Sequence, residues 1–181
     1  MTITAKQEAE AFEILDHSMT RITVVADGGF DEFQARFEAT MPASTPQDVI
    51  RGVENWQQAV ALVEAKAPFG LLIYRKGDVH SVMKLAGHTA KCAYYLIGNF
   101  TVADPAYGIN PSVFPYFPFQ VCLWEGPDGR PRVSLDQPSS ALAIFQNEAI
   151  SKVACEFDLK FGRLLQSLSC VVPEALCEPA N

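Results

Sequence analysis

The sequence predicts an α+β protein in which helices pack on one face of an antiparallel sheet. Two apolar, aromatic and β-branched runs, 90–99 and 118–125, have strand length and end in turn residues, as buried strands do. Gly126-Pro127-Asp128-Gly129 follows the second run and predicts a hairpin into 132–135. Strands that occur as adjacent pairs between helices, without strict β-α alternation, indicate an antiparallel sheet.

The chain before these strands is expected to supply helices and two further strands. Residues 21–26 are β-branched and run into a Gly-rich turn, which predicts the first strand. A helix with a buried face is expected next, because large apolar side chains recur at spacings of three and four until Pro42. The members of this face are Phe30, Phe33, Phe37 and Met41.

Two more helices and the second strand are predicted between residues 45 and 87. Thr45-Pro46-Gln47-Asp48 has the signature of a helix start, and 56–63 continues as a helical face. The second strand is placed at 71–74, with a turn at 76–78. Ser81 is expected to cap a short helix that ends at Gly87.

The second half of the chain is expected to contain a long loop and one long helix. Residues 100–117 hold four prolines and glycines among aromatic residues, which predicts an ordered loop with at most a short helix. Asp136, Ser139 and Ser140 are expected to cap the turns that follow, and Asn147 the long helix. The apolar face of this helix comprises Ile150, Val153, Ala154, Phe157, Phe161, Leu164, Leu165 and Leu168.

Composition favours a soluble globular protein without a nucleic-acid partner. The chain has 181 residues, 49% hydrophobic and 19% charged, with no apolar run of membrane-spanning length and no secretory signal, so we expect it in the cytoplasm and not at a membrane. A formal charge of −7 opposes binding to phosphate backbones. Five cysteines without a CxxC pair indicate free thiols in a reducing compartment.

No metal or cofactor site is predicted from the sequence. His88 and Cys92 are four residues apart but straddle the junction of a turn and a strand, so they are not expected to converge on a metal. Cys92 and Cys122 both lie in apolar strands, where a free cysteine usually acts as a small buried hydrophobe.

Four short motifs in the second half resemble the domain of unknown function 302 family. They are Tyr95-Leu96-Ile97-Gly98-Asn99, Tyr116-Phe117-Pro118-Phe119, Trp124-Glu125 with Asp128-Gly129, and Asp136-Gln137-Pro138-Ser139-Ser140, and their order and spacing match over about 69–168. The resemblance implies a curved antiparallel sheet backed by helices, similar to the TATA-box-binding-protein-like fold and often dimeric. It implies no reaction.

This chain departs from the family's pattern at three positions. Phe100 replaces the usual proline, Gln120 a basic residue and Leu135 a tyrosine. A ligand that those groups serve elsewhere in the family is therefore expected to be lost or changed here. With the resemblance included, the chain is interpreted as one domain, divided into an N-terminal arm or helix (1–18), a first strand with a helical insertion (19–68), a family-like core (69–168) and a tail (169–181).

Two groups of residues are candidates for a functional site. Asp78 and His80 could act as an acid-base pair, although at a turn they more often only cap the following helix. Asn99, Tyr95, Tyr107 and Tyr116 are candidate ligand contacts, although a turn asparagine more often bonds its own backbone and the tyrosines also suit simple packing. We expect both groups and the loop 100–117 to converge on an apolar cleft at one end of the sheet.

The sequence does not identify a function. A non-catalytic module that binds a small apolar or aromatic ligand, or assembles as a homodimer, is favoured, because a one-sided sheet leaves a face or edge to be covered. The alternative is a small cofactor-independent hydrolase or isomerase that uses Asp78 and His80.

Overall fold

A computed structural model gives the fold, and the structure describes residues 14–176. The elements in chain order are β1 (Arg21–Val25), α2 (Phe30–Thr40), α3 (Pro46–Ile50), α4 (Trp56–Lys66), β2 (Leu72–Asp78), α5 (Val79–Lys84), β3 (Cys92–Gly98), α6 (Phe100–Ile109), the 3-10 helix η1 (Pro111–Tyr116), β4 (Phe119–Glu125), β5 (Pro131–Asp136), α7 (Pro138–Leu142), η2 (Ala143–Phe145), α8 (Glu148–Ser167) and η3 (Glu174–Leu176). Most of the expected N-terminal helix and the end of the tail lie outside the described residues.

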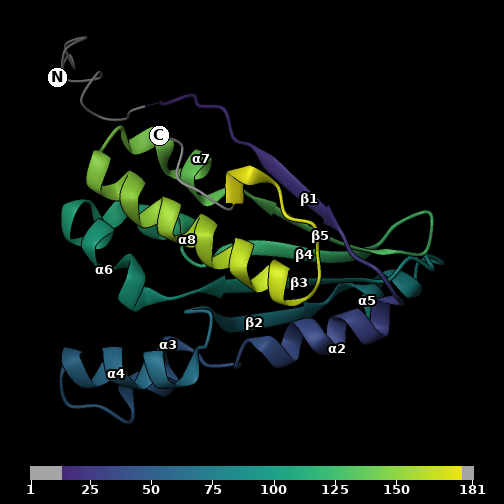
Figure 1. The fold of residues 1–181 in the computed structure, drawn as a ribbon, viewed down its shortest axis with the longest axis horizontal. Helices are drawn as coiled ribbons and strands as arrows, with labels where there is room; N and C mark the ends of the chain where they lie inside the picture. The colour runs from purple at the N-terminus through teal and green to yellow at the C-terminus, as the bar shows by residue number, and fades with distance from the viewer. Residues whose placement is uncertain (1–13, 177–181) are drawn as a thin grey trace, which may run out of the picture.

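The five strands form one open antiparallel sheet with the order β1-β5-β4-β3-β2. This confirms the predicted fold class. The strands β2 and β3 are direct neighbours, with Leu72 opposite Gly98 and Asp78 opposite Ala93. The end of β2 and the end of β3 therefore lie at opposite ends of the sheet, where Figure 1 places α5 and α6.

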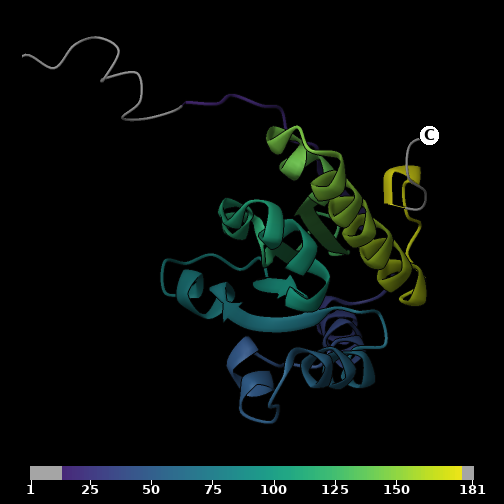
Figure 2. The same ribbon diagram turned by 90° about the vertical axis from the view of Figure 1, so that its left-hand side faces the viewer.

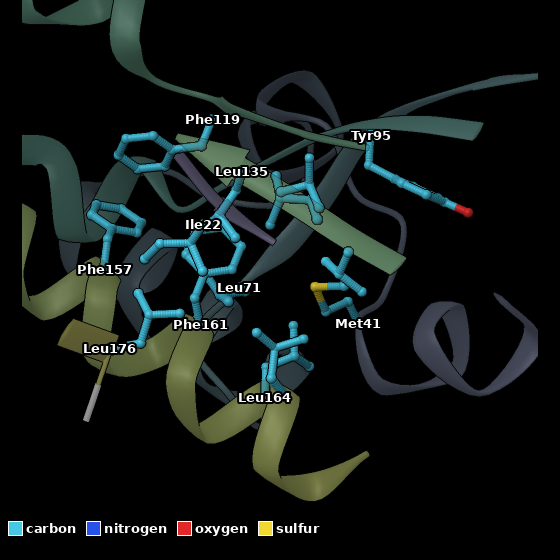
Figure 3. Packing of buried hydrophobic residues seen from close by; sticks show 14 of the residues in the cluster. Ile22, Met41, Leu71, Tyr95, Phe119, Leu135, Phe157, Phe161, Leu164 and Leu176 are labelled. Atoms are coloured by element: carbon cyan, nitrogen blue, oxygen red, sulfur yellow. The ribbon is translucent and has the colours of Figure 1, made fainter. Parts of the chain in front are cut away.

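The long helix α8 lies along one face of the sheet and supplies much of the core (Figures 1 and 2). Its first turn is capped as predicted, because the Asn147 side chain accepts from the backbone N–H groups of Ala149 and Ile150. All eight residues of the predicted apolar face are buried. Phe157 and Phe161 both contact the ring of Phe119 on β4, at centroid distances of 5.0 and 6.1 Å (Figure 3).

The helix α2 covers the same face beside α8. Phe33 and Phe37 are fully buried, and the Phe37 ring lies 5.2 Å from that of Tyr95 on β3. The predicted face of this helix is confirmed, including Met41 just after its last residue.

A second, smaller cluster lies on the other side of β2. Leu72 points away from Ile73, because successive side chains of a strand face opposite sides, and it packs with Val49 of α3 and Val63 of α4. Thr45 and Asp48 form the predicted capping box at the start of α3. Figure 1 shows α3 and α4 beside β2, away from α8.

The strand β2 is longer than the sequence predicted. The expected turn at 76–78 is wrong, because β2 continues to Asp78 and pairs with β3 over that length. Gly77 serves packing here: an added Cβ would lie 1.9 Å from the ring of Tyr94. The N-cap of α5 is accordingly Asp78, whose side chain accepts from the Ser81 N–H, and not Ser81.

The predicted loop 100–117 is also wrong, because this segment forms α6 and η1. Asn99 caps α6 and Asn110 caps η1, each through its side-chain oxygen. Pro105 lies inside α6, and Pro111 opens η1. From the sequence, these prolines were interpreted as helix breakers. For Pro111 this was wrong because the first residue of a helix needs no backbone N–H for a helical hydrogen bond.

The predicted caps before α7 are replaced by contacts from elsewhere in the chain. Asp136 forms an ion pair with Arg21 across β1 and β5 at 2.8 Å. The first turn of α7 is capped by Asp158 of α8, which accepts from the Ser139 N–H at 3.3 Å. Desolvation by burial raises the pKa of Asp158.

Between residues 14 and 176, the structure has no helix with the length and apolarity needed to span a membrane.

Candidate functional site

An apolar pocket of about 200 Å³ lies where the end of β3 meets α6 and η1. Gly98 and Asn99 contribute the end of the strand. The rest of the lining is nearly all rings: Pro46, Tyr74, Phe100, Phe114, Phe117 and Pro118. No charged side chain is among the lining residues that the structure describes.

Tyr74 supplies the phenol of this pocket. Its hydroxyl oxygen accepts from the Phe100 backbone N–H at 2.9 Å, and the hydrogen bonds of the described residues include no acceptor for its own proton. Burial raises the pKa of Tyr74, so the phenol stays protonated at neutral pH. A ligand in the pocket can therefore accept one hydrogen bond from it.

The residue Phe100 makes this arrangement possible. Its backbone N–H positions the Tyr74 hydroxyl at the pocket. A proline at position 100 would have no N–H to donate. The backbone of Phe100 therefore sets the polar lining of this pocket.

Asn99 lies at the pocket, but its polar atoms are bonded to the protein. The side chain is buried and donates from Nδ2 to the Gly70 carbonyl at 3.0 Å. Its Oδ1 accepts from the N–H and the hydroxyl of Thr101 at 2.9 and 2.7 Å. These bonds make Asn99 the cap of α6, which is the structural role that the sequence favoured.

Exposed aromatic rings form the rim of the pocket. Phe114 is 42% exposed and meets the ring of Tyr107 edge-on at 5.2 Å. On the Phe100 side, Trp56 is 43% exposed and its ring lies 6.0 Å from that of Phe100. Two large, partly exposed rings therefore flank the apolar pocket, Phe114 in its lining and Trp56 beside Phe100.

The other candidate ligand contacts do not meet at this pocket. Tyr95 is fully buried beneath α2, where its hydroxyl donates to Glu38 at 2.7 Å and accepts from Gln34 at 2.8 Å. Tyr116 packs edge-on against Phe145 and lines a separate cleft of about 540 Å³. Of the four candidates, Asn99 lines the apolar pocket and Tyr107 supports its rim through Phe114.

Asp78 and His80 lie at the opposite end of the sheet, so the expected convergence on one cleft is wrong. The Asp78 carboxylate accepts from the N–H and the hydroxyl of Ser81, and these bonds lower its pKa. The His80 Nδ1 lies 3.1 Å from the Ala90 carbonyl oxygen. The two side chains line one cleft of about 270 Å³, but their hydrogen bonds are those of helix and turn caps.

A larger and more polar cleft, about 630 Å³, lies on the other side of Asn99. Its charged lining is balanced, with Glu64 and Glu156 against Lys160 and Arg163. Lys160 forms an ion pair with Glu156 at 3.2 Å. These four side chains therefore give the cleft no net charge.

Sequence reasoning missed Tyr74, Phe114 and Phe117 as lining residues. Tyr74 was read as part of a buried strand, and the rings around Pro115 as part of a loop. The available signal was the density of aromatic residues from Phe114 to Phe119, which exceeds what a connector needs.

Within residues 14–176, no three histidine, cysteine, aspartate or glutamate side chains gather in a group suited to a metal ion.

Fold and pocket together define a small α+β domain with an open five-stranded antiparallel sheet and an apolar pocket at one sheet end. The family model described as "Domain of unknown function DUF302" matches residues 51–168, so the chain belongs to this family. The strand β1 and the helix α2 precede the match. Family membership brings no specific function with it.

A solved structure supports the same fold. The chain is similar to an uncharacterized conserved DUF302 protein from Bacillus stearothermophilus, with a TM-score of 0.60 and 13% identity, over 82% of this chain and 98% of that one. At this identity the likeness shows the fold alone. No curated protein matches the chain.

Proposed function

We propose that this protein is a non-catalytic domain that binds a small, flat and weakly charged compound in the apolar pocket at the end of β3. The supporting observation is a ring-lined hollow of about 200 Å³ that contains one protonated phenol. A cavity of about 150 Å³ accommodates a benzene ring. The pocket therefore suits a single aromatic ring with a small substituent.

The lining sets the chemistry of the ligand. Desolvating a charged ligand among these rings, with no opposite charge in the lining, costs several kcal/mol. A neutral compound avoids this desolvation cost and gains offset or edge-on contacts with Phe114 and Phe117. One acceptor atom, such as a carbonyl oxygen, meets the hydroxyl of Tyr74.

The alternative, an acid-base enzyme, has less support. The carboxylate of Asp78 is engaged by Ser81 and the imidazole of His80 approaches a backbone carbonyl. An acid-oriented histidine needs the carboxylate at its ring nitrogen. The pocket between α6 and β3 contains no carboxylate, imidazole or thiol among its lining residues.

A thermal-shift screen of neutral one-ring compounds tests ligand binding. A compound at a hundredfold excess over its dissociation constant stabilises the native state by about 2.7 kcal/mol, which raises the melting temperature by several degrees. Phe114→Ala removes the rim of the pocket and is expected to abolish the shift. Tyr116→Ala is the matched control, because it removes a ring that lines the other cleft.

The control variant shows which of the two clefts binds the compound. A shift that survives Phe114→Ala and disappears in Tyr116→Ala would place the site in the 540 Å³ cleft and refute the proposed pocket. If no neutral one-ring compound stabilises either the wild type or the control variant, the proposed binding of this class of ligand is refuted.

We also propose that two copies associate through α5. Figure 1 shows α5 between β2 and β3, at one end of the sheet. This helix has no buried residue, and three apolar side chains in it or directly after it are exposed: Val82, Met83 and Leu85. Asp78 is the N-cap of the helix and Lys84 is its last residue. Antiparallel packing of two copies about a two-fold axis would therefore bring opposite charges together.

Light scattering at micromolar concentration tests the dimer. The wild type is expected to have twice the mass of one chain, and Leu85→Glu to be a monomer, because it puts a charge into the apolar contact. Val171→Glu is the matched control, since Val171 is 90% exposed and Leu85 is 89% exposed. A monomeric wild type, or a dimer that survives Leu85→Glu, contradicts the proposal.

A further inference from the structure

Two cysteines from neighbouring strands approach each other on the sheet. The Sγ atoms of Cys92, on β3, and Cys122, on β4, lie 3.6 Å apart. Cys92 is opposite Trp124 in the register, and Cys122 is opposite Tyr94. The two cysteines are therefore diagonal neighbours whose side chains project from the same face of the sheet.

This face is the one turned away from the main core. The neighbours of Cys92 and Cys122 along their strands, Ala93, Val121 and Leu123, are buried in that core, so by alternation the cysteines point the other way. Both thiols are free and partly buried. The half-buried setting gives an ion access while keeping part of the bulk water away.

We propose that Cys92 and Cys122 form a two-thiolate binding site for a soft monovalent metal ion of the copper(I) type. Soft thiolate ligands select such ions, which accept two-coordinate sites. Two metal–sulfur bonds of about 2.3 Å place the sulfurs roughly 3.8 Å apart at a tetrahedral angle and about 4.6 Å apart in a line. From 3.6 Å, the sulfurs have to open by roughly 0.2 Å for the bent arrangement and by about 1 Å for the linear one.

The same distance is less suited to a disulfide. A disulfide requires an S–S separation of about 2.05 Å, so the sulfurs would have to close by more than 1 Å from 3.6 Å. Diagonal neighbours in an antiparallel pair have Cα atoms about 7–8 Å apart, at or beyond the usual limit for a disulfide. Metal bridging therefore requires a smaller displacement of the sulfurs than disulfide formation does.

Binding involves no redox step. Two S–H bonds break, two metal–sulfur bonds form, and two protons leave to solvent. Burial and the neighbouring Cys92 raise the pKa of the Cys122 thiol to about 12, so the metal must displace a firmly held proton. The positive charge of Arg21 lowers this pKa, although Arg21 is already paired with Asp136 at 2.8 Å.

This site differs from the sequence-based expectation of no metal. The cysteines are 30 residues apart in sequence and their strands are joined through α6 and η1, so their register was not predictable. The ligand pocket at the end of β3 includes neither cysteine. The proposal stands independently of the proposed ligand.

Competition for copper(I) under anaerobic, reducing conditions tests the site. The 181-residue chain is titrated against copper(I) bathocuproine disulfonate, and proton release is followed in weak buffer. We expect the wild type to take one copper(I) and release up to two protons. Cys92→Ser and Cys122→Ser are each expected to lose at least a hundredfold in affinity.

Two further cysteines serve as matched controls. Cys155 is a partly buried thiol on α8, and Cys170 is a buried thiol just after this helix. Cys155→Ser and Cys170→Ser are expected to bind as the wild type does, and circular dichroism checks that all four variants fold. Equal affinity in Cys92→Ser and the wild type, or a wild type that takes no copper(I) from the competitor, overturns the proposal. X-ray absorption that finds three or more sulfur ligands overturns it as well.

Discussion

Replacing Phe157 by alanine is expected to lower the free energy of unfolding by about 3–5 kcal/mol. Phe157 is fully buried at the middle of the α8 face (Figure 3). Its ring touches those of Phe117 and Phe119 at 5.2 and 5.0 Å, so the substitution removes both the transfer energy of the ring and its aromatic contacts. The cavity left behind lies between a helix and a sheet that cannot both move inward.

Chemical denaturation with a two-state fit measures this loss. Phe114→Ala is the matched control, because Phe114 is 42% exposed and its loss is expected to cost less than about 1 kcal/mol. A loss below about 1 kcal/mol in Phe157→Ala would contradict the packing of α8 on β4.

Asn99→Ala is expected to lower the free energy of unfolding by about 2–3 kcal/mol. Loss of an N-cap alone costs about 0.5–2 kcal/mol. In addition, the buried amide donates to the Gly70 carbonyl, and an acceptor left without a partner costs about 1–3 kcal/mol. The two costs are not fully additive, because both contacts end at one side chain.

Asn110→Ala is the control for this substitution. Asn110 caps η1 through the same pair of bonds, to the N–H and hydroxyl of Ser112 at 3.0 and 2.7 Å, but at the surface. Its loss is expected to cost at most about 1 kcal/mol. Equal losses at the two positions, measured by denaturant midpoint, would show that the buried bond to Gly70 contributes nothing.

The regular parts of the fold were predictable because periodicity reports burial directly. The face of α8 and the face of α2 follow a 3.6-residue repeat, and all of their predicted members are buried. The hairpin between β4 and β5 has a Gly-Pro-Asp-Gly turn that admits few other structures. The local sequence pattern was therefore sufficient to predict these helices and this hairpin.

The errors arose where a tertiary contact overrides a local signal, or where one local signal received more weight than another. Gly77 looked like a turn residue, but the ring of Tyr94 occupies the space that a side chain would need, so a glycine suits the strand. The prolines at 105 and 111 looked like breakers, but Asn99 and Asn110 cap the helices that contain them. The contact of Gly77 with Tyr94 depends on the pairing of β2 with β3, whereas the two asparagine caps are local bonds, to Thr101 and Ser112, that the prolines outweighed in the interpretation.

The candidate site was only partly predictable for the same reason. Asn99 was named from its position at a strand end, and it does line the pocket. Tyr74 and Phe114 are 40 residues apart and meet only because β2 pairs with β3 and η1 folds back beside it. Direct pairing of β2 and β3 also separates Asp78 from Asn99, which the sequence had placed together.

A crystal structure of the protein with the strongest neutral one-ring compound tests the proposed function most directly. The proposal predicts electron density for the ring between Phe114 and Phe117, with an acceptor atom within hydrogen-bonding distance of the Tyr74 hydroxyl. Density in another cleft, or an empty pocket at a saturating concentration of the compound, would contradict it.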